Sequence, residues 1–160
     1  MSVSHATMKT VTYYLKVSSS SSPEFIDITD EVSGFLKASG ISNGMLLVFS
    51  RHTTSAIVIQ ENEPLLLEDF KGMLESVSSK EASYRHNDFD VRTVHMHENE
   101  CPNGHSHCQH LVLGSSEMVP VIDGEMPLGE WQRIFMVELD GIKGEMVGNR
   151  EVLVQIMGLG

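Results

Sequence analysis

Two continuous apolar runs constrain this fold more than any other feature of the sequence. Residues 44–50 read GMLLVFS and residues 55–60 read SAIVIQ. Both have the length of a strand, and neither shows the strict apolar and polar alternation of a half-buried strand. We therefore expect residues 44–50 to form a central strand buried on both faces, with residues 55–60 as a second buried strand. The polar residues at 51–54 and 61–63 would then mark strand ends.

Local patterns predict the remaining elements. Apolar residues at helical spacing predict a helix from residue 29 or 30 to Gly40, and another from Pro64 to about residue 78. A short helix is expected from about residue 106 to 113. Segments rich in β-branched and aromatic residues predict further strands. These strands are expected at residues 9–17, 25–28, 117–122, 131–139 and 151–157.

Six or seven strands and two main helices, without regular βαβ alternation, predict an α+β fold. Mixed or antiparallel sheet would dominate it, with two sheets packed together. A length of 160 residues fits one domain that spans residues 1–160. Residues 1–7 show no periodicity and are expected to form a disordered tail.

The chain is acidic, with 22 Asp and Glu against 11 Lys and Arg and a formal net charge of -11. Without a basic cluster, we expect no nucleic-acid partner. A small phosphorylated ligand remains compatible, because amides, hydroxyls, a metal ion or one arginine bind phosphate locally. The longest apolar run, residues 45–49, is far shorter than the roughly 20 residues of a membrane span. Only two cysteines and no signal peptide favour a cytoplasmic location.

Residues 95–114, HMHENECPNGHSHCQHLVLG, hold five of the eight histidines and both cysteines. Imidazole is concentrated there among turn-forming residues, which favours metal binding or proton transfer. Exposed histidines without a common target are the alternative interpretation. His105, His107 and His110 have the spacing HxHxxH. A closed zinc-finger-like site is disfavoured because only one, widely spaced cysteine pair exists, whereas an open site with three protein ligands is allowed.

Two further polar groups are candidates for a site. His52 stands between the two apolar runs, and Thr53 and Thr54 follow it with hydroxyls and amides that can donate to a phosphate. Hydroxyls that simply cap a strand end are the alternative interpretation of these threonines. His86 is two residues from Asp88, so in an extended loop both would lie on one side. Asp88 could then orient His86 or share a metal ion with it.

Four segments together resemble the YjbQ-like family, known as secondary thiamine-phosphate synthase. They are HTTSAIVIQENE at 52–63, YRHND at 84–88, NGHSHCQHLVLGSS at 103–116 and LGEWQRIFMVELDG at 128–141. The resemblance covers nearly the whole chain from about Lys9. It implies an α+β fold with a strongly β core, and a homotrimer with sites near subunit boundaries. By position, it implies as site residues His52, Glu61, Asn62, His86, Asp88, Asn103, His107, Trp131, Gln132 and Arg150. Less typical of the family, and not carried over, are His105, His110, Cys101 and Cys108.

The implied reaction transfers an aminopyrimidine methyl group from its diphosphate to thiazole phosphate. His52, His86 and His107 would converge as catalytic residues and metal ligands, on a divalent ion (zinc or magnesium) or on a phosphate group. Asp88 would orient them, and Arg150 would neutralise the departing diphosphate. Substrate contacts would come from Thr53, Thr54, Glu61, Asn62, Asn103 and Gln132. Because one fold hosts several chemistries, two alternatives remain: a metal-dependent hydrolase of a small phosphorylated or cyclic substrate, and a non-catalytic metabolite-binding trimer.

Overall fold

The computed structural model describes residues 7–141 and 148–160. Residues 1–6 of the expected N-terminal tail therefore lie outside the described residues. The described residues form seven strands, three α-helices and one 3-10 helix. In chain order they are β1 (Met8–Ser19), β2 (Glu24–Asp27), α1 (Thr29–Ser39), β3 (Asn43–Ser50), β4 (Ser55–Gln60), α2 (Pro64–Val77), η1 (Arg85–Asn87), α3 (Gly104–Leu113), β5 (Ser116–Val121), β6 (Arg133–Glu138) and β7 (Gly148–Leu159).

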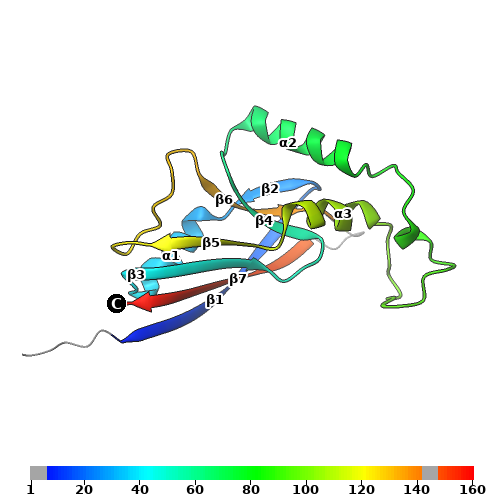
Figure 1. Ribbon diagram of the computed structural model, residues 1–160. Helices are drawn as coiled ribbons and strands as arrows, with labels where there is room; N and C mark the ends of the chain where they lie inside the picture. Colours follow the sequence, from blue (N-terminus) through cyan, green and yellow to red (C-terminus); the bar gives the residue numbers. More distant parts are fainter. Residues whose placement is uncertain (1–6, 142–147) are drawn as a thin grey trace, which may run out of the picture.

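The strands form two sheets, one of four strands in the order β1-β7-β3-β5 and one of three in the order β2-β6-β4. Every neighbouring pair is antiparallel, which confirms the α+β expectation and narrows it from mixed to antiparallel sheet. The two expected main helices are α1 and α2, and the short helix expected from about residue 106 to 113 is α3, which begins slightly earlier, at Gly104. Figure 1 shows α2 on the side of the three-stranded sheet that faces away from the four-stranded sheet.

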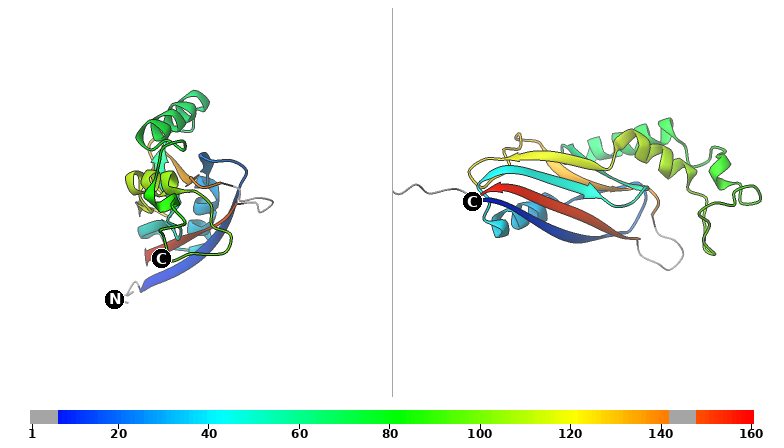
Figure 2. Two further views of the ribbon diagram at one scale, coloured as in Figure 1. Left: turned by 90° about the vertical axis from the view of Figure 1, so that its right-hand side faces the viewer. Right: turned by 60° about the horizontal axis from the view of Figure 1, so that its bottom comes forward.

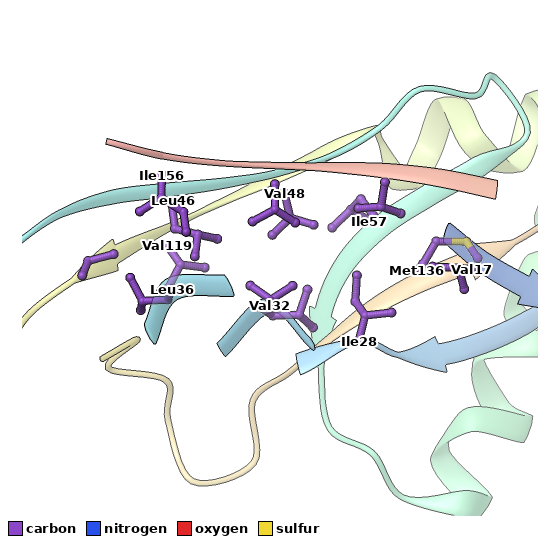
Figure 3. Close-up of a cluster of buried hydrophobic side chains, with 14 of the residues drawn as sticks. Val17, Ile28, Val32, Leu36, Leu46, Val48, Ile57, Val119, Met136 and Ile156 are labelled. Carbon is purple, nitrogen blue, oxygen red and sulfur yellow. The ribbon is translucent and has the colours of Figure 1, made fainter. Parts of the chain in front are cut away.

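The main core lies between the two sheets, with α1 beside the three-stranded sheet (Figure 3). Val32 and Leu36 of α1 point toward β3 and β7 and are buried there. The helix begins at Thr29, as expected, but its side chain does not cap it. Thr29 Oγ1 donates to Asp27 Oδ1 at 2.6 Å and accepts from the Ile134 amide at 2.8 Å, which ties the helix start to β6. Gly40 ends α1 with a φ of 67°.

A second core packs α2 against the outer face of the three-stranded sheet. It contains Leu74 of α2 and, from β6, Phe135 and Val137, all fully buried. Pro64 is the first residue of the helix, and the Glu63 carboxylate accepts from the Leu65 and Leu66 amides at 3.0 and 2.7 Å. The three-stranded sheet is therefore covered on both faces, as expected for residues 55–60.

The expectation that residues 44–50 are buried on both faces was wrong for the single chain. Leu46 and Val48 are fully buried, but Met45 and Phe49, on the opposite face of β3, are 47% and 37% exposed. The right-hand view of Figure 2 shows why: none of the described helices and strands covers the outer face of the four-stranded sheet. β3 is central within its sheet, between β7 and β5, yet its outer side chains remain uncovered.

Candidate anion-binding cleft

A cleft of about 900 Å³ is lined by residues of η1 and α3 and by the strand ends near them. Figure 1 shows α3 and the segment before it toward the right of the view. Five parts of the chain build the cleft: the β3–β4 connection, η1 with the segment that follows, the start of α3, the end of β6 and the start of β7. Its lining residues are Thr53, Thr54, Arg85, His86, Val91, Arg92, Val94, His95, Glu100, Asn103, His107, Asp140 and Arg150.

The start of α3 is fastened to η1 by one side chain. Asn87 Oδ1 accepts from the amides of Asn103 and Gly104 at 3.1 and 2.9 Å, and so satisfies two donors at the helix start. Gly104 also packs against Tyr84, since a Cβ added at Gly104 would stand 2.5 Å from the Tyr84 Cβ. The Tyr84 hydroxyl is held in turn by the Ser79 carbonyl at 2.6 Å. This close packing fixes η1 relative to α3.

The docking of η1 on α3 brings His86 and His107 together. Their ring centroids are 4.7 Å apart, with the planes at 67°, an edge-to-face arrangement. Burial, followed by repulsion from His86, lowers the pKa of His107, while the Asp140 carboxylate acts in the opposite direction. A lowered pKa favours the neutral imidazole of His107 near pH 7, a form that accepts a proton or a hydrogen bond.

Arg150, which lines the cleft, forms an ion pair with Glu138, which lies beneath the protein surface. Arg150 Nε donates to Glu138 Oε2 at 2.7 Å and its Nη2 donates to Oε1 at 2.5 Å, and Glu138 is fully buried. The Asp140 and Gly141 amides donate to the same carboxylate at 2.9 and 3.1 Å. Burial alone would raise the pKa of Glu138, but the hydrogen bonds from Arg150 and these amides outweigh it, and the pKa is lowered. Arg150 is therefore committed to a protein carboxylate, which was not expected of a residue that neutralises a leaving group.

The other two arginines of the cleft differ in their pairing. Arg92 lies 3.3 Å from the Glu100 carboxylate and also donates to the His95 carbonyl at 3.0 Å. Arg85 is exposed, and its guanidinium makes no ion pair with any residue that the structure describes. Arg85 is thus the cation of the cleft whose charge is least neutralised by the protein.

Several of the site residues predicted from the sequence lie together and others do not. His86, His107, Thr53, Thr54, Asn103 and Arg150 all line the cleft. His52 does not: its Nε2 accepts from the Glu151 amide at 3.0 Å, so the ring is turned to β7. Asp88 is exposed just after η1 and is also outside the lining. The three histidines expected to share one pocket therefore do not converge within the single chain.

Glu61, Asn62 and Gln132 lie at the other end of β4, a strand about 20 Å long at the usual rise per residue. Asn62 Nδ2 donates to Asp27 Oδ2 at 3.0 Å, and Gln132 Oε1 accepts from the Gly129 amide at 2.8 Å. Trp131, from the same end of the sheet, is 64% exposed. None of these side chains lines the cleft.

The described residues contain no group of three or more His, Cys, Asp or Glu that could hold a metal ion. His86 and His107 supply two imidazoles, one fewer than the three ligands of an open catalytic zinc site. His52, His86 and His107 therefore do not form the expected metal site within the described chain. Binding of a zinc or magnesium ion stays a prediction. His105 and His110 lie outside the cleft, where their Nε2 atoms pair with the hydroxyls of Ser106 and Ser115. Cys101 and Cys108 are free thiols.

Sequence reasoning missed several residues of the site, among them Arg85, Asn87, Glu138 and Asp140. Glu138 could have been found from the sequence, because it stands inside the apolar run IFMVEL. A carboxylate in a buried strand needs a charged or hydrogen-bonding partner. Arg85 and Asn87 stand beside His86 in the YRHND segment, but only the docking of η1 on α3 shows what each contacts.

These observations define a class of protein: an α+β fold of two antiparallel sheets, with a cleft at one end that is lined by three arginines among other residues. The chain belongs to the YjbQ-like family, since the model of the family described as "UPF0047 protein YjbQ-like" matches residues 13–159. A UPF0047 protein of Methanothermobacter thermautotrophicus is 46% identical over 151 residues, 94% of each chain.

Two solved structures share the fold. A YbjQ-like protein of unknown function from Sulfolobus solfataricus superposes with a TM-score of 0.82 at 35% identity, over 95% of this chain and 99% of that one. A hypothetical protein from Aeropyrum pernix has a TM-score of 0.80 at 30% identity, over 92% and 98%.

The expected secondary thiamine-phosphate synthase activity was wrong as an inference from the family. The relatives carry only a family designation, and the Sulfolobus structure is described as a protein of unknown function. The part of the chain that the structure describes also lacks the expected metal-holding cluster. Within the same part, no helix is both long and apolar enough to cross a membrane.

Proposed function

We propose that the cleft binds a small phosphorylated molecule. The observation that carries this proposal is Arg85, which lines the cleft without a carboxylate partner among the described residues, in a chain with a net charge of -11. Arg92 and Arg150 line the same cleft but are paired with Glu100 and Glu138. His86 and His107 lie against each other in the same cleft. A local gathering of cations in an acidic protein favours an anionic ligand at that place.

The individual groups suit a phosphate monoester. Arg85 offers a guanidinium without a protein carboxylate partner among the described residues, and guanidinium binds phosphate through two parallel hydrogen bonds. His86 and His107 each carry at least one ring N–H that can donate to a phosphate oxygen, and Thr53 lines the same cleft with a hydroxyl group. Arg150 contributes less to binding because Glu138 already neutralises it.

The test is calorimetric titration with glycerol 3-phosphate as the probe. Replacing Arg85 by alanine is expected to raise the dissociation constant about tenfold to a hundredfold, because a hydrogen bond to a charged group contributes about 1.5–3 kcal/mol. Lys71→Ala is the matched control: it removes one positive charge from α2, where Lys71 pairs with Glu68 away from the cleft. Wild-type protein that does not bind the probe, or Arg85→Ala protein that binds it equally well, would contradict the proposal.

We also propose that the chain self-associates through the outer face of the four-stranded sheet, as a homotrimer. The strand register places apolar side chains in adjoining rows on this face: Met45 pairs with Met157 and Pro120, Leu47 pairs with Met118, and Phe49 pairs with Leu153. An uncovered apolar patch of this kind is typical of a protein interface.

Light scattering after size exclusion would test this second proposal. A charge at the centre of the face, Met45→Asp, is expected to lower the measured mass from that of the oligomer toward the 17.7 kDa of one chain. Leu65→Asp places the same charge on an apolar side chain of α2 that is 75% exposed and away from this face, and should leave the mass unchanged. A wild-type protein that elutes as a single chain would refute self-association.

A further inference from the structure

We propose that the ligand of the cleft carries a hydroxyl group that donates to Asn103 Oδ1, so that the preferred ligand is a hydroxyalkyl phosphate rather than a simple phosphate. This inference rests on the proposed phosphate-binding function and specifies its substrate class. It comes from a single buried acceptor, Asn103 Oδ1, which accepts no hydrogen bond from any residue that the structure describes.

Asn103 is held on every other side. Its side chain is only 6% exposed and lines the cleft. Its amide donates to Asn87 Oδ1 at 3.1 Å, and its carbonyl accepts from the amides of Ser106 and His107 at 3.0 and 3.3 Å. Its Nδ2 donates to Asp140 Oδ2 at 3.0 Å. Of the two polar atoms of the side chain, Nδ2 is therefore bound to Asp140, and Oδ1 is the one without a partner among the described residues.

The contact with Asp140 also decides which way the Asn103 amide faces. A carboxylate oxygen accepts hydrogen bonds, so the nitrogen of the amide must face Asp140 and the oxygen must face away from it. The remaining site is consequently an acceptor, and its complement on a ligand is a donor such as a hydroxyl. A ligand hydroxyl would give this oxygen the hydrogen bond that the described residues do not supply, whereas an alkyl group would leave it unsatisfied.

The position of Asn103 relative to the cations sets the length of the ligand. Asn103 immediately precedes α3, His107 lies in the first part of that helix, and both residues line the cleft together with Arg85 and His86. A phosphate bound by Arg85 and the paired histidines would thus leave Asn103 within reach of a hydroxyl a few bonds from the ester oxygen. Glycerol 3-phosphate has such hydroxyls, whereas n-propyl phosphate has the same carbon chain and lacks them.

Calorimetric titration of wild-type protein with these two esters tests the inference directly. We expect glycerol 3-phosphate to bind about tenfold more tightly than n-propyl phosphate, the discrimination that one buried hydrogen bond supplies. In Asn103→Leu, a change to a side chain of similar size without an acceptor, the two dissociation constants should become equal within about twofold. The comparison in wild-type protein requires no substitution, so it remains decisive even if Asn103→Leu does not fold.

The outcomes separate this inference from the proposal beneath it. If wild-type protein binds both esters with equal affinity, the hydroxyl contact is refuted while phosphate binding stands. If Asn103→Leu still binds glycerol 3-phosphate more tightly than n-propyl phosphate, another residue accepts from the hydroxyl and the assignment to Asn103 is wrong. If neither ester binds, phosphate binding itself fails and the inference fails with it. Glycerol alone should not bind measurably, because it lacks the charge that Arg85 recognises.

Discussion

Replacing Glu138 by alanine is expected to lower the free energy of unfolding by about 3–5 kcal/mol, the usual cost of leaving one member of a buried ion pair without its partner. Glu138 is fully buried, and the side chain of Arg150 is only 13% exposed. The substitution would also remove the carboxylate to which the Asp140 and Gly141 amides and the Ser19 hydroxyl donate. Urea denaturation followed by circular dichroism would measure the change.

Two controls show whether the loss comes from the buried pair. Glu68→Ala breaks the exposed pair with Lys71 on α2 and should cost no more than about 0.5 kcal/mol. The double substitution Glu138→Met with Arg150→Met removes both charges and should recover much of the loss. A double variant no more stable than Glu138→Ala would contradict the explanation.

The same pair predicts how stability depends on pH. Because the folded-state pKa of Glu138 is lowered, the carboxylate stabilises the fold above its unfolded-state pKa and ceases to do so as the pH falls through the folded-state value. The difference in unfolding free energy between wild type and Glu138→Ala should therefore be full at neutral pH and shrink in acid. A difference that grows in acid would have the wrong sign.

Gly104→Ala is expected to destabilise the fold by about 1–3 kcal/mol and to weaken ligand binding in the cleft. The added methyl group would stand 2.5 Å from the Tyr84 Cβ and 2.7 Å from its Cγ, so η1 must move away from α3. That movement would separate His86 from His107, whose ring centroids are now 4.7 Å apart. Thermal unfolding and calorimetric titration with glycerol 3-phosphate would measure both effects.

Gly34→Ala is the matched control for this substitution. Gly34 lies inside α1, and a Cβ added there would meet nothing within 4 Å. Alanine is a better helix former than glycine, so the control should gain about 0.5–1 kcal/mol in stability and leave binding unchanged. If Gly104→Ala behaved like Gly34→Ala, the contact between Gly104 and Tyr84 would not be what positions η1.

Much of the fold could be predicted from local sequence patterns. Pro64 at a helix start and Gly40 at a helix end act through their own backbone preferences, so α1 and α2 begin and end close to the expected residues. The error at residues 44–50 has a different cause. An apolar run indicates that side chains need cover but not whether that cover comes from the same chain, and Met45 and Phe49 are uncovered within one chain.

The candidate site was less predictable because it depends on contacts between distant residues. His86 and His107 are 21 positions apart and meet only because Asn87 fastens η1 to the start of α3. His52 was expected in the same place, but the short turn after β3 points its ring to the Glu151 amide. Arg150 lines the cleft as expected, yet the partner that neutralises it, Glu138, could not be named from spacing.

The Glu138 carboxylate links three strands, since Arg150 belongs to β7 and Ser19, which donates to Glu138 Oε2 at 3.0 Å, ends β1. Both of those strands are in the four-stranded sheet, whereas Glu138 ends β6 of the three-stranded sheet. The ion pair of Glu138 with the cleft residue Arg150 therefore also connects the two sheets. Substitutions that change ligand preference in related proteins should therefore be found mainly in η1 and in residues 91–100. These segments line the cleft but contribute no contact between the two sheets.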